Sequence, residues 1–352
     1  MNTDARRMPS RRRGAIGVAA IIVVGAASLA VLLGRDGDDE AATPPTSDDA
    51  SVGVLPLLGT VGSVPERAAL VVKIDGTERG RPQSGLSEAD VVFEEMVEGG
   101  LTRLLAVYQS QDPDTVGPVR SARSTDLSIL DELGRPLFAW SGANPTFAAA
   151  VRSADVVDVG AAAAPDAYRR SDDRSAPYNL YAAPDLLREA AADEPAATTP
   201  PDPLFTYRED DEPPGTEAAP ATGFRTTGSL ATDIEWTWDA ERDGWVRNQE
   251  GTPLVDTTGA RVRATNVVVR FTPYRDSGVR DSTGAVVPEA EAVGEGEAWL
   301  LSGGSAQPGR WNKPSADAVT IYTDTAGQPL QLAPGVTWVE VLPPGSGEIV
   351  RQ

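Results

Sequence analysis

Apolar runs of strand length alternate with helical patterns between about Val64 and Arg188. The run AALVVKI (Ala68–Ile74) is apolar except for one lysine, as in a strand that is buried on both faces. Two further runs, ADVVFEEMV and TRLLAVYQS, flank Glu98-Gly99-Gly100, and this pattern predicts a hairpin. The short runs LFAWSG and VVDVG predict two more strands.

Helical spacing follows the predicted hairpin. The segment STDLSILDELG carries three leucines at helical spacing, opens with Ser124 as a possible N-cap and closes at Gly134. A second helix is predicted from about Pro145 to Ser153, and a third ends near Ala192. This order of strands and helices predicts an α+β or α/β domain with a mixed sheet over residues 64–190.

Helical periodicity is nearly absent after about Gly223. The segment WTWDAERDGWVR has an Asp-Gly turn between tryptophan-bearing segments, and NVVVRF is typical of a strand. The C-terminal run VTIYTDTAGQPLQLAPGVTWVEVL predicts a hairpin and a final strand. Residues 226–352 are therefore predicted to form a second, mostly β domain.

Two acidic, proline-rich segments interrupt these patterns. Residues 34–63 open with GRDGDDEAATPPTSDDASVG, which has too little apolar surface to fold and predicts a disordered linker. Residues 191–225 contain DEPAATTPPDP and REDDEPPGTEAAPATG, and are predicted to form a second linker or a long loop.

The N-terminus predicts a membrane anchor. Residues 1–13 carry five arginines, and residues 14–33 (GAIGVAAIIVVGAASLAVLL) contain Ser28 as their only clearly polar side chain. A helix of this length spans about 30 Å, the thickness of a bilayer core. The positive-inside bias keeps the arginines in the cytoplasm, so a single-pass anchor with both domains outside is expected. A cleaved signal peptide is the alternative.

Composition narrows the chemistry. The chain of 352 residues contains neither cysteine nor histidine, which excludes disulfides, thiolate sites and Ser-His catalysis. Its formal net charge is −21, and much of the acidic excess lies in the two linkers. The sequence displays no basic face of the kind that binds nucleic acid, so a nucleic-acid partner is not expected.

The motif GPVRSAR places Arg120, Ser121 and Arg123 just before the first predicted helix. Forked guanidinium groups, hydroxyls and the N–H groups of a helix N-terminus together suit phosphate, sulfate or carboxylate. The motif therefore predicts an anion-binding pocket. The alternative is that both arginines pair with carboxylates of the nearby FEEMVEGG segment and only brace the fold.

Other polar groups lie near the ends of the predicted strands, where ligands bind in open sheets. If FEEMVEGG is a strand, Glu94 and Glu98 are about 13 Å apart, too far for a glycosidase-like acid and base. The segment YRRSDDRSAPYNLY combines charge with aromatic faces, as in sites for sugars or anionic polymers. The predicted ligand-binding residues are Arg120, Ser121, Arg123, Asp75, Arg81, Gln83, Ser84, Glu94, Glu98, Arg103, Arg174 and Asn179.

No cofactor is predicted, and no catalytic residue is assigned. Ca²⁺ or Mg²⁺ held by Asp75 and Glu94 remains an alternative, because hard cations need only oxygen ligands. Lys73 lies inside an apolar run, so its ammonium group must either reach solvent or be paired.

The run RPQSGLSEADVVFEEMVEGGLTRLLAVYQSQDPDTVGPVRSAR resembles the signature of the YerB-like family of bacterial lipoproteins, built from a domain of unknown function. RSAPYNLY, GRWNKP and PGVTWVEVLP resemble its downstream segments, so the resemblance covers most of the chain from about Val64. It implies an envelope-anchored, extracytoplasmic protein of two domains with no agreed activity.

The chain departs from the family pattern in three respects. It lacks the lipoprotein cysteine, Gln109 and Tyr178 stand where relatives often carry histidine, and Gly76 follows Asp75 where asparagine is common. If those histidines are catalytic in relatives, this chain is altered or inactive.

Three functions fit these features. The first is a membrane-tethered module that binds an anionic envelope ligand, such as a phosphate- or carboxylate-bearing glycan or wall polymer. The second is a carboxylate-dependent hydrolase acting on such a ligand. The third is a structural partner of another envelope protein, in which the charged clusters only stabilise the fold.

Overall fold

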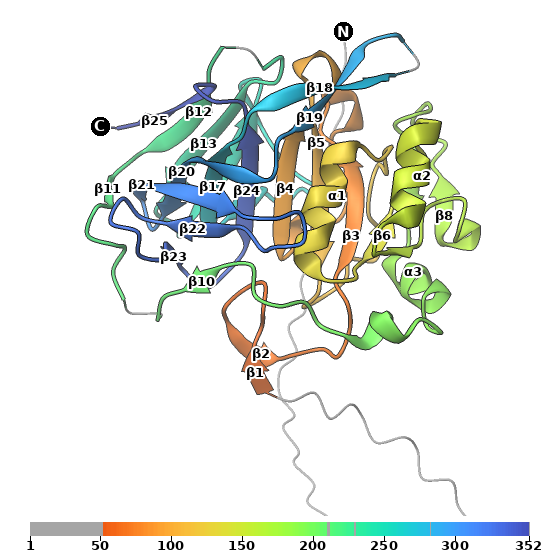
Figure 1. Ribbon diagram of the computed structural model, residues 1–352, viewed down its shortest axis with the longest axis horizontal. Coiled ribbons are helices and arrows are strands. Elements are labelled where there is room, and N and C mark those ends of the chain that lie inside the picture. Colours follow the sequence, from red (N-terminus) through yellow and green to blue (C-terminus); the bar gives the residue numbers. More distant parts are fainter. Residues whose placement is uncertain (1–51, 210–211, 229, 282, 352) are drawn as a thin grey trace, which may run out of the picture. The chain divides into compact units, whose positions relative to one another are not determined.

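The computed structural model describes residues 52–209, 212–228, 230–281 and 283–351 (Figure 1). The predicted basic tail (1–13), the predicted anchor (14–33) and the predicted linker as far as residue 51 lie outside the described residues. Within the described ranges, no helix is long and apolar enough to cross a membrane.

A mixed sheet of eleven strands forms the centre of the described chain, in the order β11-β21-β20-β17-β24-β4-β5-β3-β6-β7, with β22 beside β21. The N-terminal half supplies β3 (Leu70–Asp75), β4 (Val91–Met96), β5 (Thr102–Tyr108), β6 (Leu137–Ala139) and β7 (Val157–Asp158). The C-terminal half supplies β11 (Ala219–Pro220), β17 (Asn266–Phe271), β20 (Gly294–Ser302), β21 (Ser305–Lys313), β22 (Ile321–Thr323) and β24 (Thr337–Leu342). The halves meet where β24 pairs in parallel with β4, so the two predicted domains share one sheet.

A second, antiparallel sheet covers one face of this central sheet (Figure 1). Its strands are β12 (Gly223–Thr226), β13 (Ile234–Asp239), β14 (Gly244–Gln249), β15 (Thr252–Pro253), β16 (Arg263–Ala264) and β25 (Gly347–Val350). Trp236 and Trp245 are fully buried between the layers, and the ring of Trp236 lies 5.3 Å from that of Trp338. Large aromatic rings thus supply much of the apolar contact between the two sheets.

Two helices cover the other face (Figure 1): α1 (Ser124–Leu130) lies over β3 and β5, and α2 (Pro145–Ser153) lies beside α1 on the side of β6. A third helix, α3 (Pro184–Ala190), buries Leu187 in the same apolar core as Leu70 of β3 and Trp236 of the second sheet. The short 3₁₀ segments are η1 (Glu78–Gly80), η2 (Leu86–Glu88), η3 (Glu98–Gly100), η4 (Asp131–Leu133), η5 (Pro165–Ala167) and η6 (Pro195–Thr198). Four two-stranded pairs complete the described elements: β1 (Val52–Val54) with β2 (Val61–Ser63), β8 (Tyr168–Arg170) with β9 (Leu180–Ala182), β10 (Thr206–Tyr207) with β23 (Gln331–Leu332), and β18 (Tyr274–Arg280) with β19 (Val286–Ala290).

Most elements predicted for the N-terminal half are confirmed. The hairpin around Glu98-Gly99-Gly100 joins β4 to β5, α2 has the predicted bounds, and the sheet is mixed. The predicted cap is wrong, because Arg123 precedes the first turn of α1 and the carboxylate of Asp126 accepts the N–H of Arg123 at 2.7 Å. Gly134 does end the η4 turn that follows α1, with a φ of 73°.

The two predicted connections differ from each other. Residues 52–63 were assigned to the disordered linker, but they form the β1–β2 hairpin around a buried Leu57. The described residues of 191–225, which exclude 210 and 211, form a long loop rather than a free linker, because Leu204 and Phe205 are buried in the core and β10 pairs with β23. In both places a few apolar side chains in a polar segment are sufficient to hold the backbone against the body.

Candidate functional site

One face of the central sheet changes from apolar to charged at the end of β3. Asp75 of β3 and Glu95 of β4 both lie opposite Arg103 of β5, so these three side chains share a face. Lys73 lies two residues before Asp75 and shares that face as well. The same face carries Val71 and Leu105 further along, where α1 covers it.

The GPVRSAR segment crosses this charged end of the sheet. The N–H of Arg120 donates to the carbonyl of Lys73 at 2.8 Å, and the N–H of Asp75 donates to the carbonyl of Pro118 at 3.0 Å. Gly117 precedes the crossing with a φ of +148°, and a Cβ there would lie 2.9 Å from the carbonyl oxygen of Leu180. Glycine is therefore required where the segment passes β9.

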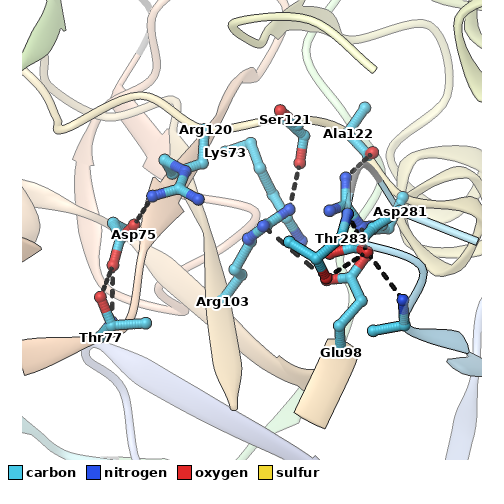
Figure 2. A network of polar contacts seen from close by, with 12 residues as sticks. Lys73, Asp75, Thr77, Glu98, Arg103, Arg120, Ser121, Ala122, Asp281 and Thr283 are labelled. Atoms are coloured by element: carbon cyan, nitrogen blue, oxygen red, sulfur yellow. Dashed lines mark hydrogen bonds and ion pairs between the residues drawn. The ribbon is translucent and has the colours of Figure 1, made fainter. Parts of the chain in front are cut away.

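A cavity of about 620 Å³ opens beside this segment, on the same side of the sheet as α2. Four arginines line it, namely Arg103, Arg120, Arg123 and Arg280. Figure 2 shows Arg120 and Arg103 lying between Asp75 on one side and Glu98, Asp281 and Thr283 on the other. The rest of the wall includes Ser121, Asn144, Pro145, Phe147 and Pro177.

Three of these arginines, Arg103, Arg120 and Arg123, form the floor of the cavity, and each is oriented by a protein acceptor. Arg120 forms an ion pair with Asp75, whose other oxygen accepts the N–H of Thr77 at 2.7 Å. Arg123 donates from Nε to Glu98 Oε1 at 2.5 Å and from Nη1 to the carbonyl of Ala122 at 2.8 Å. These contacts fix the direction of both guanidinium groups.

Arg103 is held in the same way, by the carbonyl of Ser121 at 3.0 Å and by Glu98 Oε2 at 3.8 Å from its two terminal nitrogens. The bracing alternative is thus correct for Glu98. Among the described residues, Arg120 donates through one guanidinium nitrogen and Arg123 through two, so Nη2 of each is available to a ligand.

The cavity carries more positive than negative charge. Its four guanidinium groups face three carboxylates, those of Glu98, Asp281 and, behind Arg120, Asp75. Burial, followed by repulsion from Arg123 and Arg120, lowers the pKa of Arg103 to about 10. The hydrogen bond from the Thr283 hydroxyl lowers the pKa of Asp281. Arg103 and Asp281 therefore stay charged at neutral pH, and the surplus of guanidinium groups favours an anion.

The predicted contribution of a helix N-terminus to anion binding is wrong. Helix α1 has only seven residues, and the carboxylate of Asp126 already accepts a backbone N–H at its first turn. The partial positive charge at the N-terminus of α1 is therefore compensated by the carboxylate of Asp126.

Glu94 lies on the opposite face of the sheet. It accepts two hydrogen bonds from Arg247 at 2.7 and 2.8 Å and one from the Thr102 hydroxyl at 2.6 Å, and it is fully buried. Glu94 therefore meets neither Glu98 nor Asp75. The alternative cation site of Asp75 and Glu94 is not assembled, and the described residues contain no cluster of three or more acidic side chains suited to a metal.

Three other predicted site residues join the two halves of the chain. Arg81 pairs with Glu250, and the Ser84 hydroxyl accepts a hydrogen bond from Thr257 at 3.0 Å. The carbonyl of Gln83 accepts the N–H of Thr257 at 2.9 Å, and its side chain donates to the carbonyl of Asp75 at 2.8 Å. Their partners explain their polarity, and none of them lines the arginine cavity.

The segment YRRSDDRSAPYNLY (residues 168–181) is also held by hydrogen bonds within the protein. Arg174 donates to the carbonyls of Gly80 and Pro82 at 2.8 and 2.9 Å, and Asn179 accepts from Arg170 at 2.7 Å. Both residues hold the loop in place, and neither lines the arginine cavity.

Lys73 is paired, one of the two states expected for it. Its Nζ lies 2.5 Å from Glu95 and 2.6 Å from Asp126, and all three side chains are fully buried. Burial raises the pKa of Glu95 to about 8, opposed by Lys73 and reinforced by Asp126. The trio lies behind the cavity wall and is sealed from solvent, so it holds the Arg120–Arg123 segment without contacting a ligand.

Sequence reasoning missed the residues that reach the cavity from the second half. Arg280 ends the strand β18 and Asp281 and Thr283 come after it, some 160 positions after the GPVRSAR motif. Their segment, RDSGVRDSTG, has turn residues that could have predicted a hairpin. Nothing local in the sequence indicates that this hairpin lies beside Arg123.

The positions that differ from the family pattern lie apart from each other. The guanidinium of Arg120 stands 5.2 Å over the ring of Tyr178, next to the cavity. Gln109 is buried just beyond β5 and donates to the carbonyl of Pro65 at 3.0 Å. A Cβ at Gly76 would lie 2.5 Å from the carbonyl oxygen of Thr102. Tyr178 contacts Arg120 directly, and Gly76 follows Asp75, the partner of Arg120.

Two family models match the N-terminal and the C-terminal parts of the chain. The profile described as "Protein of unknown function (DUF3048) N-terminal domain" matches residues 58–197, and that of the DUF3048 C-terminal domain matches residues 225–339. The chain is 28% identical over 293 residues to "Putative lipoprotein YerB" of Bacillus subtilis (strain 168), covering 82% of this chain and 86% of that protein. The crystal structure of Bacillus subtilis YerB matches with a TM-score of 0.72 and 25% identity, over 84% of this chain and 98% of the other.

Proposed function

The chain belongs to the YerB-like DUF3048 family, and on that premise we propose that it is an envelope protein that binds an anionic ligand in the arginine cavity. The ligand class is a glycan or wall polymer that carries phosphate or carboxylate groups. The observation that carries the proposal is the convergence of Arg103, Arg120 and Arg123 on one cavity with surplus positive charge.

Attachment to the outer side of the cell membrane is part of this proposal. The Bacillus subtilis relative is named a lipoprotein, a class that is held at the membrane by its N-terminus. Here the apolar residues 14–33 follow five arginines and take the place of a lipidated cysteine. A single-pass anchor would hold the folded part next to envelope polymers.

Binding is favoured over hydrolysis because the cavity offers no protonated carboxyl group among its described residues. A carboxylate-dependent hydrolase needs a protonated acid beside its ligand. In the cavity, Glu98 is paired with Arg123, and the pKa of Asp281 is lowered. Burial raises the pKa of Glu95 and that of Glu340 to about 8, but both side chains are sealed in the interior.

Thermal denaturation of the full chain tests the proposal with a panel of phosphate, sulfate, glycerol phosphate polymer and glucuronate, each with and without Mg²⁺ or Ca²⁺. Binding to the folded state raises the melting temperature. We expect a rise in the wild type that is lost in Arg123→Ala. The matched control is Arg310→Ala, because the polar contact of Arg310 within the described residues is an exposed ion pair with Glu295. If no anion shifts the wild-type melt, the proposal is wrong.

A further inference from the structure

The β18–β19 hairpin stands apart from the large sheets. In the described chain its two strands pair only with each other, whereas the floor of the cavity is built by β5 and residues 120–123 of the other half. The hairpin nevertheless contributes Arg280, Asp281, Thr283 and Val287 to the cavity. The cavity is therefore complete only when both halves of the chain are present.

The base of the hairpin is fixed to the body. The Tyr274 hydroxyl donates to the carbonyl of Val341 at 2.8 Å and accepts the N–H of Met96 at 3.1 Å. At the end of β19, the N–H of Ala290 donates to the Thr125 hydroxyl at 3.0 Å. Hydrogen bonds to β4, β24 and α1 thus hold the hairpin beside the charged end of the sheet.

The outer part of the hairpin is exposed and irregular. Its pairing shifts register between Asp276 and Arg280, and Gly278 has a φ of +76°. A bulge of this kind turns the strand and re-aims the side chains beyond it. Arg280, directly after the bulge, is an exposed residue that lines the cavity.

The cavity is much larger than an anionic group. A phosphate or carboxylate fills only a small part of about 620 Å³, a volume typical of sites for complete small molecules. With the anion on Arg120 and Arg123, the remaining space is bounded by Phe147 and Pro145 at the start of α2 and by the hairpin. Flat apolar groups together with hydroxyl and amide groups are suited to the faces and hydroxyls of a sugar ring.

We propose that the β18–β19 hairpin is the specificity element of the site and binds the carbohydrate body that is attached to the anionic group. The inference rests on the proposed function, because it assumes that the floor arginines hold the anion. Arg280 supplies guanidinium donors to ring hydroxyls, and the Thr283 hydroxyl, which donates its proton to Asp281 at 2.6 Å, supplies an acceptor, opposite the apolar wall of α2.

Calorimetric titration of the full chain tests this division of labour. The probes are inorganic phosphate, acetate, glucose 1-phosphate, glucuronate and uncharged glucose. The variants are Arg280→Ala and Thr283→Ala, and the matched control is Arg275→Ala, which lies on the same hairpin but pairs with Glu289 outside the cavity. Comparison of glucose 1-phosphate with glucuronate shows which anionic group the floor prefers.

We expect the wild type to bind at least one anionic sugar about 10-fold or more tightly than the corresponding simple ion. Arg280→Ala should weaken binding of the anionic sugar more than binding of the simple ion, and so reduce this preference to less than about 3-fold, whereas Arg275→Ala should keep it. Equal affinity for the sugar and the ion, or an equal loss of both in Arg280→Ala, would overturn this inference alone. If the wild type binds none of the charged probes, the proposed function and this inference both fail.

Discussion

The two faces of the central sheet carry charge in opposite ways. On the face beneath the second sheet, Arg247, Glu94 and Glu340 are fully buried, and Trp236 donates to Glu340 at 2.8 Å. The guanidinium of Arg247 also lies 5.3 Å over the ring of Trp338. This cluster is closed to solvent. On the other face, Arg103, Arg120 and Arg123 line an open cavity.

The difference separates a structural charge cluster from a binding site. A buried charge requires full compensation by partners, because no water reaches it. Arg247 donates two hydrogen bonds to Glu94 and one to Gln249, all inside the core. The cavity arginines keep donors for a ligand, and their positive charge is not fully neutralised. Charge alone therefore does not mark the site, whereas charge with unused donors beside a cavity does.

The largest effect is expected at the closed cluster. Arg247→Ala leaves Glu94 buried without its cation, so it should lower the free energy of unfolding by about 3–5 kcal/mol. Chemical denaturation followed by circular dichroism measures the change. The control is Arg225→Ala at the exposed pair with Glu348, where the loss should stay below about 1 kcal/mol. A loss below about 1 kcal/mol in Arg247→Ala would mean that the cluster does not brace the halves.

At the arginines that line the open cavity, we expect a smaller effect on stability but a clear effect on binding. Arg120→Ala should weaken anion binding by about 10- to 100-fold, the equivalent of a charged hydrogen bond of about 1.5–3 kcal/mol. Arg120→Lys keeps the charge beside Asp75 but loses the forked geometry, so an intermediate affinity is expected. Titration calorimetry gives both values, and unchanged affinity in Arg120→Ala would remove this residue from the site.

The buried carboxylates predict the dependence of stability on pH. In the folded chain the pKa of Glu95 and that of Glu340 are raised to about 8, chiefly by burial, from an ordinary value of 4.5. Between these values the folded state holds protons that the unfolded state has released. The contribution of these two groups to the free energy of unfolding is therefore fully present below about pH 4.5 and is lost as the pH rises through about 8, by up to about 1.4 kcal/mol per pH unit for each group.

Glu95→Gln and Glu340→Gln separate the two contributions. Each replaces a titrating carboxyl group by a neutral amide of the same shape, so each should flatten the pH dependence of the unfolding free energy. The measurement is a series of denaturant titrations between pH 5 and pH 9. A wild-type stability that rises over this range would contradict the assigned direction for both groups.

The smallest effect is expected at Arg81, which the sequence assigned to the site. Its partner Glu250 is partly exposed, and such pairs contribute about 1 kcal/mol or less. Arg81→Ala should lower stability by that amount and leave anion affinity unchanged. A loss of affinity comparable to that in Arg120→Ala would extend the site towards the junction of the two halves.

The elements of the N-terminal half could be predicted because their signals are local. The apolar run at β3, the glycines after Glu98 and the leucine spacing of α1 each specify structure within a few residues. The motif with Arg120 and Arg123 identified the floor of the cavity for the same reason. Neighbouring donors on one short segment stay together in any fold.

Long-range relations could not be predicted from these patterns. The pairing of β24 with β4 places Glu340 beside Glu94, although some 250 residues separate them in sequence. Strand alternation puts Glu94 and Glu95 on opposite faces, but it does not say which face meets the cavity. Arg81 and Arg174 resembled ligand contacts because their acceptors lie in distant loops.

The central claim, that the open arginine cluster binds an anion, is tested most directly by equilibrium dialysis of the full chain against labelled glycerol phosphate polymer at low ionic strength. Wild type and Arg310→Ala should retain the polymer, and Arg120→Ala and Arg123→Ala should not. Retention should also fall as salt is added, because the contact is ionic. If the wild type retains no polymer, or if the two cavity variants retain as much as Arg310→Ala, the cavity does not hold this anion and the account is contradicted.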